Sequence, residues 1–112
     1  MKLQSKIKIA GCLFLLSALL GYAAPASENW ENHCTKCHGA DGKGQTKIGK
    51  KLSLKDYTAA AVQAEMKDAA MAKDIADGVK DKAGKEKMKA FSSELSSEEI
   101  QALVAYIRKF QA

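Results

Sequence analysis

The clearest pattern of apolar and polar positions lies near the carboxyl end, over residues 96–110. Ser96 is followed three residues later by Glu99, the S-x-x-E signature of a capping box, and apolar residues then recur at helical spacing. Arg108 and Lys109 stand where the negative end of a helix dipole favours cations. We therefore predict a helix over residues 96–110. Its apolar stripe would consist of Ile100, Leu103, Val104, Ile107 and Phe110, with Tyr106 beside it.

A first short helix is predicted over residues 29–37, where Trp30 lies four residues ahead of Cys34 and shares a face with it. Residues 38–51 are predicted to form a loop, because glycines interrupt any regular pattern there. These glycines are Gly39, Gly42, Gly44 and Gly49.

Two more helices are predicted in the middle of the chain. The first covers residues 57–67, which are rich in alanine, with Thr58 as its N-cap. The second covers residues 68–77 and ends at Gly78. Residues 79–91 are predicted to form a second loop, since no segment shows the strict alternation of an amphipathic strand. The apolar face of the second helix would consist of Met71, Ile75 and Val79.

The amino-terminal segment has the order of a secretory signal peptide, with lysines, then an uncharged apolar stretch, then small residues. Cleavage after Ala26 fits the small-x-small rule through Ala24 and Ala26. Residues 1–26 are therefore predicted to be removed on export, which leaves residues 27–112 as one domain in the periplasm or another exported compartment. The alternative is an uncleaved membrane anchor, because the 19 uncharged residues 9–27 approach the ~20 that span a bilayer as a helix.

Removing the signal changes the charge of the chain. It takes three of the 18 basic side chains and none of the 13 acidic ones, so residues 27–112 carry a net charge of +2 rather than +5. This balance gives no case for nucleic-acid binding. A domain of 86 residues is also near the lower limit of what a core stabilises without a disulfide, metal or cofactor.

The chemistry of the chain is indicated by residues 34–38, Cys-Thr-Lys-Cys-His. C-x-x-C-H is the attachment signal of c-type haem, and a histidine is an ordinary proximal ligand of haem iron. Cys34 and Cys37 are therefore the predicted thioether sites and His38 the predicted proximal ligand, with one covalent haem c per chain. The porphyrin would supply missing apolar mass, so the haem-free polypeptide is expected to be largely unfolded. The alternative for the two cysteines is a disulfide or a zinc site, which would need acidic side chains to complete it.

The second axial ligand can be argued by elimination. His33 lies on the same stretch of backbone as the proximal ligand and cannot reach the other face of the iron, so it is expected to be a solvent-exposed polar residue. Methionine, lysine, water or an open position remain. Met88 is favoured, because it lies in a polar loop without an obvious packing reason, whereas Met66 and Met71 fall in helical patterns that suggest core filling.

These motifs together resemble a small class I cytochrome c, over essentially the whole of residues 27–112. The resemblance rests on Trp30, Cys34-x-x-Cys37-His38-Gly39-Ala40-Asp41-Gly42-Lys43-Gly44, Met88-x-Ala90-Phe91, and Leu95-Ser96-x-Glu98-Glu99-Ile100 through Tyr106-Ile107.

The resemblance implies an all-α cytochrome c fold, with three to five short helices around one covalently attached haem and with terminal helices crossing near Trp30 and Tyr106. It implies the same thioether sites, with His38 and Met88 as axial ligands. The implied function is single-electron transfer between larger redox proteins, not enzymatic catalysis. The alternative is a haem enzyme or gas sensor whose distal methionine is displaceable.

The chain departs from the family pattern in two places. Lys89 stands where the family often has proline after the ligand methionine. The family commonly holds the proximal histidine through a carbonyl next to a proline, but Pro25 is the one proline of this chain. The acceptor for the His38 ring N–H is therefore expected near residues 48–52.

Charge is unevenly distributed in the expected domain. Residues 34–55 have a net charge of +5, residues 56–77 of −3, and residues 78–91 of +3. The two basic segments carry the expected axial ligands, so a positive rim around the haem edge would steer a larger redox protein with an acidic face. The alternative is that these lysines are merely solvated. A monomer is expected.

Overall fold

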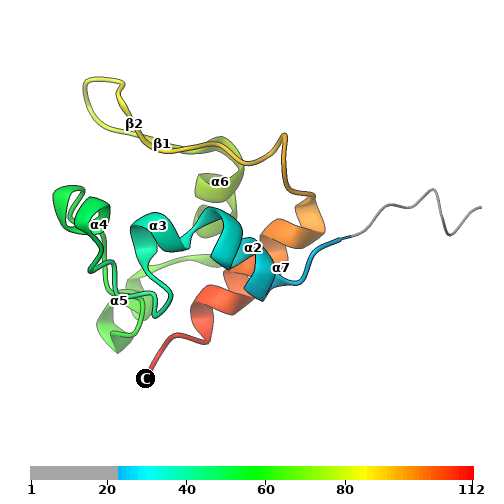
Figure 1. Ribbon diagram of the computed structural model, residues 1–112, viewed down its shortest axis with the longest axis horizontal. Coiled ribbons are helices and arrows are strands. Elements are labelled where there is room, and N and C mark those ends of the chain that lie inside the picture. Colours follow the sequence, from blue (N-terminus) through cyan, green and yellow to red (C-terminus); the bar gives the residue numbers. More distant parts are fainter. Residues whose placement is uncertain (1–22) are drawn as a thin grey trace, which may run out of the picture.

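The computed structural model describes residues 23–112, which fold into short helices and one small hairpin (Figure 1). Most of the predicted signal segment lies outside the described residues. No helix within residues 23–112 has the length and apolar character needed to cross a membrane. The elements, in chain order, are α2 (Ala26–His33), α3 (Thr35–His38), α4 (Lys47–Lys51), α5 (Ala60–Glu65), α6 (Asp68–Asp77), β1 (Val79–Lys80), β2 (Glu86–Met88) and α7 (Ser97–Arg108).

The predicted carboxyl-terminal helix and its capping box are confirmed in α7. Ser96 is the N-cap, its hydroxyl accepts from the Glu99 N–H at 3.1 Å, and the Glu99 carboxylate accepts from the Ser96 N–H at 3.1 Å. The helix ends two residues earlier than predicted, and Phe110 lies beyond its end, half-buried. The rest of the predicted stripe is buried, namely Ile100, Leu103, Val104 and Ile107.

The terminal helices α2 and α7 pack against each other, as the resemblance implied (Figure 1). The Trp30 and Tyr106 rings lie 5.7 Å apart between centroids. The Asn29 amide donates to the Glu99 carboxylate at 2.8 Å, so the glutamate of the α7 capping box also binds α2. The core around this crossing consists of Trp30, Met71, Ile75, Phe91, Leu95, Ile100, Leu103, Val104 and Ile107.

The predicted continuous helix over residues 29–37 is wrong, because the backbone is interrupted at Cys34. Its φ of −119° lies far from the helical value of about −63°, and α3 begins at the next residue. Hydrogen bonds still run through the interruption, from the Cys34 N–H to the Trp30 carbonyl and from the His38 N–H to the Cys34 carbonyl, at 2.9 Å each. A residue pattern alone does not reveal a break of this kind.

The loop predicted over residues 38–51 contains the short helix α4. Thr46 caps it, and the Thr46 hydroxyl accepts from the Gly49 N–H at 2.9 Å. Gly49 was interpreted as a helix breaker, but it lies inside the helix because the chain passes close to it. A Cβ there would lie 2.6 Å from the Cys37 carbonyl oxygen and closer still to that of Gly44.

The helix predicted over residues 57–67 is shorter in the structure. It is α5, and its N-cap is Ala59 without a side-chain hydrogen bond. Thr58 is not the cap, because its hydroxyl instead donates to the Asp56 carboxylate at 2.6 Å. The following helix, α6, has the predicted bounds and ends at Gly78, whose φ is +77°.

Residues 79–91, predicted to be a loop without strands, contain the antiparallel pair β1–β2, with Val79 opposite Met88. The pattern missed it because two or three residues are too few for alternation to register. The Asp81 carboxylate accepts from the N–H groups of Ala83 and Lys85 at 2.9 Å each and so stabilises the turn. The hairpin extends from the helical body (Figure 1), and the fold remains all-α apart from it.

Candidate haem site

The predicted site residues meet in one cavity of about 700 Å³, within the usual 300–1,000 Å³ of cofactor sites. Cys34, Cys37, His38 and Met88 all line this cavity. Its other walls include side chains of the apolar core, namely Trp30, Met71, Ile75, Phe91, Leu103 and Ile107.

Both cysteines are free and half-buried. Burial, and secondarily the nearby Cys37 thiol, raises the pKa of the Cys34 thiol to about 11. The N-cap residue of α4 binds the motif, because the Thr46 hydroxyl donates to the Cys37 carbonyl at 2.6 Å. On the other side, the Trp30 indole N–H donates to the Gly39 carbonyl at 3.1 Å. These two hydrogen bonds therefore fix the carboxyl end of the C-x-x-C-H segment through contacts within the polypeptide.

His38 lies among aromatic rings. Tyr57 stacks on it with 5.3 Å between ring centroids and 19° between planes, and the Trp30 ring lies at 5.7 Å. Burial lowers the pKa of the imidazole, which favours its neutral form. A neutral imidazole is the form that binds a metal.

The carbonyl acceptor expected near residues 48–52 for the His38 ring is not found. Within residues 23–112, His38 Nδ1 is a buried nitrogen without a hydrogen-bond partner. Helix α4 stands where a loop was expected, and the carbonyls of Ile48, Gly49 and Lys50 accept from the N–H groups of later residues. A buried nitrogen in this state is costly, and such atoms often mark a place that a ligand or water completes.

Met88 ends β2 and is half-buried at the cavity wall. Its backbone packs on Gly78, where a Cβ would lie 2.6 Å from the Met88 carbonyl oxygen. Just beyond it, Phe91 and Ser92 donate backbone hydrogen bonds to the Ile75 and Ala76 carbonyls of α6 at 2.9 and 3.1 Å. Helix α6 therefore holds both ends of the segment that carries Met88.

The two other methionines also line the cavity, in different surroundings. Met71 is a buried core residue of α6, as its helical pattern predicted. Met66 is half-buried at the end of α5, where its carbonyl accepts from Arg108 at 2.8 Å. Arg108 also binds the Gln63 carbonyl at 2.7 Å and the Asp68 carboxylate, and so fixes this connection.

His33, expected to be solvent-exposed, is half-buried. Its side chain is 27% exposed, its Nδ1 lies 3.8 Å from a Glu94 carboxylate oxygen, and its ring meets the Phe91 ring edge-on at 5.4 Å. Sequence reasoning missed this contact, and it also missed Tyr57 and Glu94 as neighbours of the site. Thr46 carried a usable signal, since threonine before a helix is a common N-cap.

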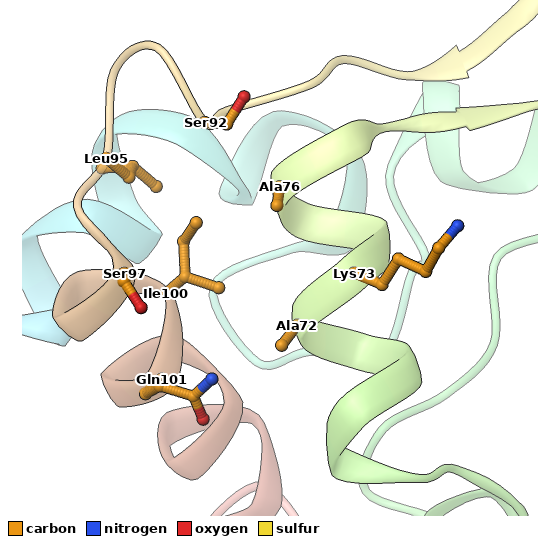
Figure 2. A pocket seen from close by; sticks show the side chains of 8 residues that line it. All are labelled: Ala72, Lys73, Ala76, Ser92, Leu95, Ser97, Ile100 and Gln101. Atoms are coloured by element: carbon orange, nitrogen blue, oxygen red, sulfur yellow. The ribbon is translucent and has the colours of Figure 1, made fainter.

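A second hollow of about 430 Å³ lies between α6 and α7 (Figure 2). It contains none of the predicted site residues. Four apolar and four polar side chains line it. They are Ala72, Lys73, Ala76, Ser92, Leu95, Ser97, Ile100 and Gln101. In the described part of the chain, no three His, Cys, Asp or Glu side chains gather to hold a metal ion, which the zinc alternative required.

The family model of cytochrome c matches residues 23–111. The chain belongs to the cytochrome c family. Among solved structures, it is similar to the KustC0563 c-type cytochrome, with a TM-score of 0.69, 29% identity, and coverage of 80% of this chain and 100% of that one. It is also similar to a tyrosine-to-phenylalanine mutant of Kustc0563, with a TM-score of 0.66, 30% identity, and coverage of 79% and 100%. No curated protein matches the chain.

As a cytochrome c, this protein carries covalently bound haem c and belongs to the haem-based electron carriers. Small c-type cytochromes are generally carriers rather than enzymes, and they are typically exported. The cavity residues of this cytochrome c fit such a group. They offer two free thiols, a buried imidazole favoured in its neutral form, and an apolar wall that a porphyrin would cover.

Proposed function

We propose that this cytochrome c is an exported carrier of single electrons that holds its haem through Cys34 and Cys37 and binds the iron with His38 and Met88. The observation that carries the proposal is that these four side chains line one cavity of about 700 Å³. When bound, the haem supplies a one-electron redox couple. The chain attaches that group, orients it and shields it from water.

The roles follow from the chemistry of each side chain. The two thiols become thioethers, so the group cannot be lost by dissociation. His38 donates a neutral imidazole from a buried position. The Met88 thioether is a soft, neutral donor that favours ferrous iron and raises the potential. If His38 and Met88 hold the iron, the chain would leave substrate no free position on the metal.

Covalent attachment is tested by the intact mass of the exported protein and by extraction with acidified organic solvent. The wild type is expected to carry the mass of one haem that extraction does not remove. Thr35→Ala, which alters one of the two residues between the cysteines, should behave in the same way. The double variant Cys34→Ala, Cys37→Ala should release any haem it holds. Release from the wild type would contradict the proposed thioethers.

The carrier is separated from a haem enzyme or gas sensor by adding carbon monoxide to the reduced protein. With Met88 on the iron, the optical spectrum should stay unchanged on the time scale of mixing. The observation that favours the alternative is Lys89, which stands where the family often has a stiffening proline. Prompt binding of carbon monoxide would support that alternative over the carrier.

For partners, we propose a larger redox protein with an acidic docking face, met by a monomer in the periplasm or another exported compartment. Lysines from both basic segments line the cavity, joined by Lys67 from between them; the set is Lys36, Lys55, Lys67, Lys87 and Lys89. Because Glu65 and Asp74 also line the cavity, these lysines leave the rim with a net charge of +3, which attracts negative charge over the ~8 Å Debye length of physiological salt.

This docking is tested with two small oxidants, one anionic and one cationic. The anionic reagent should oxidise the protein faster at low salt and slow as salt rises, and the cationic one should show the opposite trend. Lys87→Glu should weaken the salt dependence, whereas Lys73→Glu, at the α6–α7 hollow, serves as the matched control. Equal and flat salt responses of both reagents would contradict a steering rim.

A further inference from the structure

Lys89 departs from the family pattern and directly follows Met88, a proposed iron ligand. Lys89 provides none of the stiffness that a proline would give by fixing φ. After β2 ends at Met88, the first backbone hydrogen bonds are those of Phe91 and Ser92 to α6. Between these two restrained points, the side chain of Lys89 makes an ion pair.

One carboxylate contacts both segments that carry iron ligands. The Lys89 ammonium pairs with Oε1 of Glu94, and His33 Nδ1 lies 3.8 Å from Oε2 of the same residue. His33 immediately precedes the first cysteine of the haem motif, and Lys89 immediately follows Met88. Glu94 thus bridges the attachment segment and the methionine segment.

Two side chains of this bridge, Lys89 and His33, contact the Phe91 ring. This ring is buried, the Lys89 ammonium lies 5.6 Å from the ring centroid, and the His33 ring meets it edge-on at 5.4 Å. The side chains of Lys89, Glu94 and His33 are 56%, 35% and 27% exposed, so the bridge is partly open to solvent. The Lys89 hydrogen bond is the main cause of a lowered pKa of Glu94, so the carboxylate is charged at neutral pH.

We propose that Glu94 is a positioning residue that ties the Met88 segment to the haem-attachment segment and restrains displacement of the Met88 thioether from the iron. The inference rests on the proposed ligation by Met88. Partly exposed ion pairs contribute little to global stability. Their effect here is on a local opening, in which a short segment leaves while the helical body stays folded.

The test is the affinity of the oxidised, haem-loaded protein for imidazole, which competes with Met88 for the iron. Glu94→Ala should bind imidazole about threefold more tightly than the wild type. Lys89→Ala should give a similar gain, and the double variant should add little to either, because both changes break the same bridge. Asp77→Ala breaks the exposed Lys73–Asp77 pair on α6 at 3.8 Å and should leave the affinity unchanged.

Two controls separate this proposal from its neighbours. The thermal unfolding midpoint of Glu94→Ala should stay close to that of the wild type, since a merely structural role would lower it without favouring imidazole. Unchanged imidazole affinity in Glu94→Ala and Lys89→Ala, with the red-region band of methionine ligation present in the wild type, would overturn the bridge alone. Absence of that band from the wild type would overturn the ligation itself, and the bridge with it.

Discussion

Gly49 of α4 lies directly against the haem motif, so close that a Cβ on it would stand 2.6 Å from the Cys37 carbonyl oxygen. The same carbonyl accepts the Thr46 hydroxyl at 2.6 Å. A helix that the residue pattern did not predict therefore supports the segment with the two free thiols. Its glycine is explained by packing rather than by a turn.

Gly49→Ala tests this contact. Helix propensity alone would make the change favourable by about 1 kcal/mol. The clash is with backbone atoms of two segments, which cannot move aside cheaply, and overpacking of this kind costs about 1–3 kcal/mol. Because the approach to the Gly44 carbonyl oxygen is closer still, we expect the clash to win and the free energy of unfolding to fall by about 2 kcal/mol.

The measurement is denaturant unfolding of the haem-loaded protein. Gly84 offers a matched control, because a Cβ there meets nothing within 4 Å and its φ of +82° is one that asparagine tolerates. Gly84→Asn should change the stability by less than about 0.5 kcal/mol. A stabilised Gly49→Ala protein would show that propensity dominates and that the close approach is relaxed in solution.

Arg108 joins α7 to the connection between α5 and α6. Its guanidinium donates to the Gln63 carbonyl at 2.7 Å, to the Met66 carbonyl at 2.8 Å and to the Asp68 carboxylate at 2.9 Å. A lysine has neither the planar fork nor the number of fixed donors for all three. Arg108→Lys should lower the free energy of unfolding by about 2 kcal/mol.

The matched control is Lys109→Gln, which changes an exposed neighbour at the same helix end and should have an effect below about 0.5 kcal/mol. Chemical denaturation measures both. If Arg108→Lys proved as neutral as this control, the guanidinium contacts would not be contributing to stability.

The Asn29–Glu99 hydrogen bond predicts how stability depends on pH. Donation from the Asn29 amide, followed by the Ser96 backbone N–H, lowers the pKa of Glu99 below its ordinary value of 4.5. A group whose pKa is depressed by folding stabilises the native state above that ordinary value, and the benefit is lost as pH falls through the folded pKa. Glu99→Gln keeps the shape of the side chain but cannot ionise.

The wild type should therefore be more stable than Glu99→Gln at neutral pH, and the difference should shrink as the solution is acidified below pH 4.5. Unfolding curves of both proteins across that range measure it. A difference that stays constant with pH would mean that the charge of Glu99 has no part in the helix crossing.

The cavity predicts that the polypeptide depends on its haem for folding. Leu52, Tyr57 and Met66 line the cavity and are only half-buried, so without the group their apolar surface stays in water at a cost of roughly 25 cal/mol per Å². The double variant Cys34→Ala, Cys37→Ala, freed of haem, should show weak helical circular dichroism and no cooperative melting. A compact haem-free form with a sharp transition would contradict this.

Features encoded within a few consecutive residues could be predicted from the sequence. The capping box at Ser96 and Glu99, the C-x-x-C-H motif and the end of α6 at Gly78 depend on neighbours along the chain. Helix α4 was missed because Gly49, which packs against Cys37, looked like a helix breaker, and the hairpin was missed because its strands are too short for alternation to register. The Thr46 hydroxyl donates to the Cys37 carbonyl, and the missing Cβ of Gly78 allows the close approach of the Met88 carbonyl.

The environment of the proximal histidine was the hardest part of the site to foresee. The prediction of an acceptor near residues 48–52 treated this segment as a loop. Helix α4 lies there, and the carbonyls of Ile48, Gly49 and Lys50 accept backbone hydrogen bonds. Tyr57 instead stacks on the His38 ring. The position of Tyr57 follows partly from a hydrogen bond of its N–H to the Gly42 carbonyl at 2.9 Å, a long connection that no local pattern encodes.

The most direct test of the proposed ligation is the optical spectrum of the oxidised protein in three methionine variants. Leucine is close to methionine in volume, so each replacement removes the sulfur with little change in packing. The weak red-region band of iron–sulfur ligation should be present in the wild type, in Met66→Leu and in Met71→Leu, and absent from Met88→Leu. A band that survives in Met88→Leu, or that disappears with one of the other two, would contradict the assignment of Met88 to the iron.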